Sequence, residues 1–227
     1  MGSFRKKLRV LLLTDSLGCP REEISVDNMW TDRILSEFGD NFTFYTSCNY
    51  GLSAKTIPMS YIGYLKPDFI ICQMGIVDAC RRALTVKEEN IISKIPYFGR
   101  IVRKFCSKKH YMLTRIRDVH YADSNEFIEA IDSLRKLAGK RLALLEIAPP
   151  GKFLIDRTFN VINDVSLYND LIFSKENPED VDVIKPYSDS GILDCDEYLL
   201  KSDGHHLNVK GNDLVYKAVK DYLLTLN

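Results

Sequence analysis

The 227-residue sequence has no excess of either charge, because 31 lysines and arginines are matched by 31 aspartates and glutamates. A protein without net charge is not expected to bind nucleic acid through its overall electrostatic field. The sequence also has no apolar run long enough to cross a bilayer. We therefore expect no nucleic-acid partner and no transmembrane segment, while a local basic patch leaves peripheral contact with a membrane open.

Paired cysteines are also missing. The six cysteines form no Cys-x-x-Cys pair and no spacing typical of a zinc site, which is characteristic of free thiols in a reducing compartment. The basic N-terminus precedes an apolar run too short for a signal peptide, and no small-residue cleavage site follows it. We expect a cytoplasmic protein.

Internal repeats, low-complexity tracts and an evident interdomain linker are absent as well. With 45% apolar and 27% charged residues, the composition is typical of a globular protein. A chain of this length predicts one domain over 1–227. The irregular part is 94–121, which is too long for an ordinary connection and is interpreted as a basic insertion.

Apolar runs of strand length alternate with helical patterns along the chain. The expected strands are the run after Lys7 that ends at Thr14, Phe42–Thr46, Asp68–Met74, Arg141–Ile147 and Val181–Ile184, and the clearest helices are Arg21–Phe38, Ser124–Ala138, Phe159–Phe173 and Asn208–Leu226. Such alternation predicts an α/β protein in which helices cover both faces of a parallel sheet. We therefore expect a three-layer α/β/α sandwich with five parallel strands.

The first strand ends in Thr14-Asp15-Ser16, followed by Gly18 at a turn. The carboxyl end of a strand is where open α/β sheets place their chemistry. A serine becomes a nucleophile when a histidine takes its proton and a carboxylate orients that histidine. Asp203 and His206, just before the last helix, supply this pair. The pattern predicts a triad of Ser16, His206 and Asp203.

Three other interpretations of these residues stay open. Ser16 could be only a turn residue, and His205 and His206 could cap the final helix or lie in a surface loop. A metal site at Asp203, His205 and His206 is disfavoured, because two neighbouring histidines do not easily face one ion and no further ligands cluster nearby. We expect no metal and no cofactor.

The two ends of the chain together resemble the SGNH (GDSL-type) hydrolases and acyltransferases. Thr14-Asp15-Ser16-Leu17-Gly18 resembles the first block of that family, with Thr14 where the family usually has glycine. Asp203 and His206 resemble its last block. The resemblance spans nearly the whole chain. It implies a flavodoxin-like SGNH hydrolase fold and assigns the triad to Ser16, His206 and Asp203.

The two middle blocks match less well. The resemblance implies that the amides of Ser16 and Gly51 bind the oxyanion, with Ala54 as an alternative register for Gly51. The third block reads Gly75-Ile76-Val77-Asp78, so Val77 replaces the asparagine that donates to the oxyanion. Losing one such donor lowers the rate about 100- to 1000-fold. Asp78 is expected to hold the loops around Ser16 or to contact substrate.

The variant third block and Ala148-Pro149-Pro150-Gly151 resemble the branch of the family associated with surface-polysaccharide (capsule) biosynthesis. The resemblance implies a serine enzyme that transfers an acetyl group to a carbohydrate, with acetyl-CoA as the possible donor. An O-acetyl esterase is the alternative, because both share the same first half-reaction. A catalytically inactive glycan-binding module is the third hypothesis, and Val77 is its best argument.

The segment 94–121 carries eight lysines and arginines against one aspartate. Tyr97, Phe98, Ile101, Val102 and Phe105 fall at helical spacing within it. Such a helix can lie on an anionic membrane, hold phosphates or bind an acidic glycan. Alternatively, it packs on the core through its apolar stripe. We expect an anionic ligand near the Ser16 crevice, held by basic side chains, and the candidates are Arg81, Arg100, Arg103 and Lys104.

Overall fold

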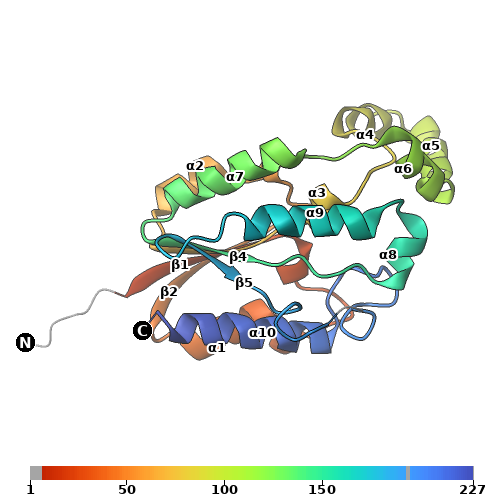
Figure 1. Cartoon of the computed structure of the whole chain (residues 1–227). Helices are drawn as coiled ribbons and strands as arrows, with labels where there is room; N and C mark the ends of the chain where they lie inside the picture. The colour runs from red at the N-terminus through yellow and green to blue at the C-terminus, as the bar shows by residue number, and fades with distance from the viewer. Residues whose placement is uncertain (1–6, 193–194, 227) are drawn as a thin grey trace, which may run out of the picture.

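The computed structural model describes residues 7–192 and 195–226. Their single sheet has five parallel strands in the order β2-β1-β3-β4-β5 (Figure 1). The strands are β1 (Leu8–Thr14), β2 (Phe42–Cys48), β3 (Phe69–Gln73), β4 (Arg141–Leu145) and β5 (Val181–Ile184). The chain leaves β1 for one neighbour, β2, and returns to pair β3 on its other side. This change of direction at β1 creates the crevice in which open α/β sheets bind ligands.

Helices cover both faces of the sheet, which confirms the predicted α/β/α sandwich. One layer contains α2 (Met59–Leu65), α7 (Ser124–Leu137), α3 (Ile76–Ala79) and α9 (Val161–Phe173), and the other contains α1 (Trp30–Phe38) and α10 (Val209–Leu224) (Figure 1). The remaining helices are α4 (Val86–Ser93), α5 (Pro96–Lys108), α6 (His110–Arg117) and α8 (Lys152–Arg157). They lie at the end of the molecule toward which the strands point (Figure 1).

The unbroken apolar run in β1 is explained by its place in the sheet. Val10, Leu11, Leu12 and Leu13 are fully buried, because β2 and β3 flank the strand and helices cover both faces. A strand buried on both faces needs no alternation of polar and apolar residues. β1 therefore ends at a defined place inside the sheet, between β2 and β3, with Ser16 just beyond it.

The expected helix over Arg21–Phe38 is wrong in its first half. A short 3₁₀ turn covers Val26–Asn28, and the α-helix begins only at Trp30. Its Ncap residue has no side-chain hydrogen bond, and the amide of Trp30 instead donates to Asn212 Oδ1 on α10 at 3.1 Å. The start of α1 is thus set by a tertiary contact that the local sequence does not reveal.

The insertion expected at 94–121 is mostly helical. It begins earlier, at Thr85, whose side chain and that of Glu88 cap each other's amides at the start of α4. Pro96 then occupies the first turn of α5, where a missing amide hydrogen is tolerated. Among the described residues, no helix has both the length and the apolarity needed to cross a membrane.

Candidate active site

Three residues from opposite ends of the chain form a continuous line of hydrogen bonds. Ser16 opens the short 3₁₀ helix η1 (Ser16–Gly18) directly after β1. Its Oγ lies 2.9 Å from Nε2 of His206, and Nδ1 of the same ring lies 2.8 Å from Oδ2 of Asp203. The structure therefore brings together all three residues of the triad predicted from the sequence.

The surroundings of Asp203 determine where the protons lie. Burial alone would raise the pKa of this carboxyl group. The hydrogen bonds from the His206 ring and from the amides of His206 and His205 outweigh that effect and hold the pKa well below its usual value. An ionised Asp203 requires His206 to carry its proton on Nδ1. Nε2 is then free to accept the hydroxyl proton of Ser16.

The turn that carries the acid and the histidine is held tightly in place. The amide of Leu200 donates to the carbonyl of His206 at 2.7 Å, which closes the loop. Gly204 has a φ of +68°, and a Cβ there would lie 2.8 Å from the amide nitrogen of Leu154. Gly151 donates its amide to the carbonyl of Gly204 at 2.8 Å. Glycine at 204 thus allows the loop to pack directly on the backbone at the start of α8.

Two buried aspartates lie beneath the serine. Asp15 is the Ncap residue of η1 and accepts the Leu17 amide on Oδ1 at 2.9 Å. Its Oδ2 is buried without a hydrogen-bond partner among the described residues. Burial raises the pKa of Asp15 to about 7, the Leu17 amide opposes the rise, and the nearby Asp78 adds to it. A protonated carboxyl group fits this site better than an ionised one.

Asp78 does not contact the crevice. It is fully buried and accepts hydrogen bonds from Ser53 Oγ at 2.5 Å and from the Ala54 amide at 2.8 Å. Of the two roles expected for Asp78, the structure therefore shows the structural one, joining the loop after β2 to α3, and no contact with the crevice. The Ala54 amide, considered as an alternative oxyanion donor, is occupied by the same bond.

A cavity of about 190 Å³ opens beside Ser16. Its lining residues are Ser16, Ile76, Val77, Cys80, Arg81, Arg82, His110, Phe153, Leu154, Arg157, Thr158, Asp203 and His205. Gly51 is not among them. It is exposed, with a φ of +70°, in a turn closed by the Leu52 amide on the Asn49 carbonyl. Of the two amides expected to bind the oxyanion, only that of Ser16 belongs to a residue lining this cavity.

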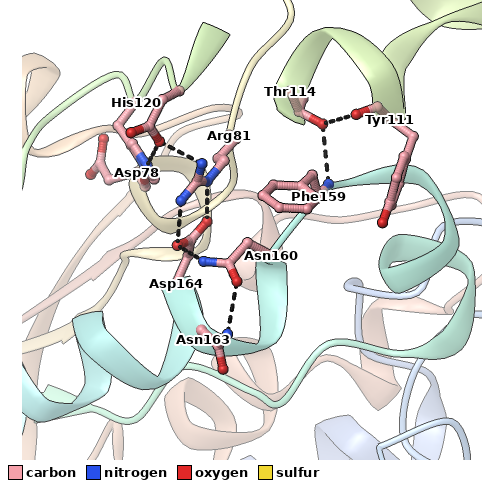
Figure 2. A network of polar contacts seen from close by, with 10 residues as sticks. Asp78, Arg81, Tyr111, Thr114, His120, Phe159, Asn160, Asn163 and Asp164 are labelled. Atoms are coloured by element: carbon pink, nitrogen blue, oxygen red, sulfur yellow. Dashed lines mark hydrogen bonds and ion pairs between the residues drawn. The ribbon is translucent and has the colours of Figure 1, made fainter. Parts of the chain in front are cut away.

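Arg81 lines the cavity, but its guanidinium group is held by acidic side chains. It forms two hydrogen bonds with Asp164, at 2.7 and 3.2 Å, and an ion pair with Asp118 at 2.6 Å. Figure 2 shows this pair beside Asn160, whose side-chain amide donates to Asp164 Oδ1 at 2.9 Å. Arg81 thus joins the loop after α3 to the start of α9.

The other basic candidates lie elsewhere. Arg100, Arg103 and Lys104 are exposed on α5 and do not line the cavity. Arg82 and Arg157 do line it, and the sequence interpretation missed Arg157. Arg157 lies on α8, after the carboxyl end of β4. This position could have indicated Arg157 as a cavity residue, because the carboxyl ends of all strands meet at the same edge of a parallel sheet.

The cavity wall is connected to the helical insertion by polar contacts. The carbonyl of Arg157 lies 2.9 Å from Nδ1 of His110 at the start of α6. The amide of Phe159 donates to Thr114 Oγ1 on α6 at 3.1 Å (Figure 2). The insertion therefore forms part of the site as well as an outer surface.

Asp203, His205 and His206 are the one group of described residues whose geometry fits a metal ion, with ligand atoms within 4.8 Å of one another. Both ring nitrogens of His206 are already hydrogen-bonded, to Ser16 and to Asp203. A metal at this position would break the line of hydrogen bonds. The pKa of His205 is lowered to about 4 by burial and by the adjacent His206, so at neutral pH it is an uncharged neighbour.

No family profile and no curated protein sequence matches the chain. Solved structures do match it. A lipase/acylhydrolase from Enterococcus faecalis superimposes with a TM-score of 0.61 at 12% identity, over 95% of each chain. The fold is that of the SGNH hydrolases.

Two further SGNH-fold structures support this assignment. A carbohydrate esterase of family 3 from Talaromyces cellulolyticus has a TM-score of 0.58 at 13% identity, over 96% of this chain and 97% of its own. A GDSL-like lipase from Bacteroides thetaiotaomicron has a TM-score of 0.59 at 12% identity, over 96% of this chain and 89% of its own. At such identities the likeness establishes the fold, and the activity has to be argued from the site.

The structural role of Arg81 can be tested through its partner. Asp164→Ala leaves the guanidinium group without its bidentate partner, and both side chains are largely buried. Asp118 still pairs with Arg81, so losing the hydrogen bonds to Asp164 should lower the free energy of unfolding by about 1.5–3 kcal/mol in urea denaturation. Asp170→Ala, an exposed site on the same helix, should change it by less than about 0.5 kcal/mol. An Arg81→Met variant that keeps its stability but binds anionic substrates weakly would support a substrate role instead.

The raised pKa of Asp15 predicts a pH-dependent stability. The pKa of Asp15 is 3.8 in the unfolded chain and about 7 in the folded protein. At a pH between these two values, the unfolded state has released a proton that the folded state retains. Stability is therefore lost as pH rises through this range. Asp15→Asn removes the titration, so its free energy of unfolding relative to the native protein should rise by about 2 kcal/mol between pH 5 and pH 8. A difference that is constant with pH would mean that Asp15 is ionised in the folded protein.

Proposed function

We propose that this protein is a serine esterase that removes short acyl groups, acetyl above all, from carbohydrate. The observation that supports this most strongly is the line of hydrogen bonds from Ser16 through His206 to Asp203, at a cavity. An arrangement of nucleophile, base and orienting acid serves acyl transfer on many unrelated folds. The site lies at the carboxyl edge of the sheet, in an SGNH fold.

The reaction would proceed through an acyl-enzyme. Ser16 Oγ attacks the ester carbonyl carbon while His206 Nε2 takes the hydroxyl proton, and Asp203 stabilises the imidazolium. The tetrahedral intermediate collapses, and the leaving sugar oxygen takes the proton from His206. Water then attacks the acetyl-serine with His206 again as the base, which releases acetate and restores Ser16.

The dimensions of the cavity favour a short acyl group. Its volume of about 190 Å³ is below the roughly 300–1,000 Å³ usual for pockets that enclose a drug-sized ligand. Among the solved structures of the same fold are the family 3 carbohydrate esterase and an acetyl esterase that contains an acetate ion. Lipases superimpose equally well, so the preference for a short acyl group rests on the volume of the cavity.

Acetyl transfer to a polysaccharide hydroxyl, with acetyl-CoA as donor, is the second candidate. The feature that favours it is the presence of Arg82 and Arg157 in the cavity wall, where guanidinium groups suit the phosphates of a nucleotide donor. The first half-reaction would be the same, and a sugar hydroxyl would replace water in the second. Incubation with acetyl-CoA and with acetylated and unacetylated glycans, followed by mass spectrometry, distinguishes a gain of acetyl from a loss.

The first prediction of this proposal concerns the triad. Ser16→Ala and His206→Ala should each lower kcat on a small acetyl ester by about 1000-fold or more, with unchanged melting temperature, because the triad acts as a unit. His205→Ala is the matched control and should have a mild effect. A fluorophosphonate probe should label Ser16 in the native protein and not in the His206→Ala variant. No labelling of the native protein would favour the inactive binding module.

The second prediction concerns the missing oxyanion donor. Val77 lines the cavity. It stands at the position where the SGNH family, which this sequence resembles, has an asparagine. Val77→Asn supplies a side-chain amide there, so kcat should rise by about tenfold or more in a small-ester assay, because one oxyanion donor contributes two to three powers of ten. Val77→Leu is the control and should not raise it. An unchanged rate in Val77→Asn would show that another group already fills this role.

A further inference from the structure

Helix α5 carries an apolar stripe that is largely exposed to solvent. Tyr97 is 84% exposed, Phe98 58%, Ile101 67% and Phe105 54%. They fall at helical spacing of three and four residues, so they share one side of α5. The alternative that this stripe packs on the core is therefore wrong. Further apolar residues of the insertion are also exposed, and these are Ile91 and Ile95 before α5 and Met112 and Ile116 on α6.

All the charged residues in the segment that contains this stripe are basic. Residues 90–117 contain no aspartate or glutamate and eight lysines and arginines. Four of these, Arg100, Arg103, Lys104 and Lys108, lie on α5 itself, and all four are exposed. Within the described part of the chain, none of the four forms an ion pair, in contrast to Arg117, which pairs with Glu88 at 2.7 Å. A protein without net charge thus has one strongly cationic and apolar end.

We propose that α5 docks the protein on the surface of a bilayer that contains anionic phospholipid. The stripe of Tyr97, Phe98, Ile101 and Phe105 would lie at the boundary between headgroups and acyl chains, and the basic side chains beside it would contact lipid phosphates. An amphipathic helix with lysine and arginine next to aromatic and aliphatic residues is suited to this position. The negative surface potential of such a membrane attracts each of those cations.

The same features disfavour other occupants. A second copy of the chain, related by two-fold symmetry, would place this cationic surface against itself, and like charges would repel. A soluble acidic polymer would pair with Arg100 and Lys104 but offers no apolar partner for Ile101 or Phe105. An anionic lipid surface offers acyl chains to the apolar stripe and phosphates to the basic side chains of α5.

Docking here would bring the Ser16 cavity close to the membrane. Arg157, in the cavity wall, donates to the carbonyl and hydroxyl of Ser107 on α5, both at 3.3 Å. The docking helix therefore contacts the cavity lining directly. The proposal itself does not depend on any catalytic role for Ser16.

The test is sedimentation of the full-length protein with large unilamellar vesicles. One set contains phosphatidylcholine alone, and the other contains about one-third phosphatidylglycerol, so that only the second has an anionic surface. We expect at least about tenfold tighter binding to the anionic vesicles, weakened as salt screens the charges over a Debye length of about 8–10 Å.

Two variant pairs separate the apolar and the charged contributions. Ile101→Ser with Phe105→Ser, and Arg100→Glu with Lys104→Glu, should each weaken binding to anionic vesicles by about tenfold or more. The matched controls are Tyr64→Ser on α2, where the side chain is 83% exposed, and Lys136→Glu on α7, which is also exposed. Neither control should change binding, and circular dichroism should show that all variants are folded.

Three results would overturn the proposal. Equal binding to both vesicle types, unaffected by the α5 variants, would exclude this surface. Light scattering that shows a dimer for the native protein and a monomer for Ile101→Ser with Phe105→Ser would assign the stripe to self-association. Binding to soluble dextran sulfate as tight as binding to vesicles, and insensitive to the serine variants, would assign the basic residues to a polyanion.

Discussion

The hydrogen bond between Ser16 Oγ and His206 Nε2 joins two segments that are 190 residues apart in the chain, and the candidate site depends on it. The bond forms because β1 ends inside the sheet, between β2 and β3, and because the loop before α10 returns to that point. Two contacts hold the returning loop. The Trp30 amide bonds to Asn212 at the start of α10, and Gly151 bonds to Gly204. The geometry of the site is thus a property of the whole fold, so a substitution that frees α10 would misplace His206 without touching it.

Two buried carboxyl groups, those of Asp15 and Asp78, hold the loops around Ser16. Burying a carboxyl group lowers stability unless its oxygens are hydrogen-bonded. Asp78 is fully satisfied by Ser53 and Ala54 and so stabilises the loop after β2 against α3. Asp15 has one oxygen without a partner, and burial raises its pKa. An apolar residue at Asp15 would remove that unpaired oxygen, but it would also leave the Leu17 amide without its cap and loosen the turn that presents Ser16. Asp15 therefore positions the hydroxyl group of Ser16 but lowers the stability of the folded protein.

Sequence reasoning found what depends on local pattern and missed what depends on tertiary contact. The five strands and the three residues Ser16, His206 and Asp203 could be predicted, because apolar runs mark buried strands and the serine directly follows one. Gly51 was expected to bind the oxyanion but does not line the cavity, because a glycine in a turn does not reveal which way the turn faces. Arg81 was expected to be available to substrate, because the sequence does not show that Asp164, 83 residues later, binds its guanidinium group. The start of α1 was misplaced because its cap is Asn212.

The helical insertion shows why exposure decides between interpretations that a sequence leaves open. The same spacing of apolar residues on α5 is compatible with a core helix and with a surface helix. The structure distinguishes them, because Tyr97 and Ile101 are largely exposed while Gly99, on the opposite side, lies against the carbonyl of Ile92 in α4. The small residue lets α4 and α5 approach closely, and this turns the large apolar residues outward. The packing that fixes α5 on the protein is thus the same packing that leaves its stripe largely exposed. The basic side chains beside the stripe are the reason for proposing a negatively charged partner.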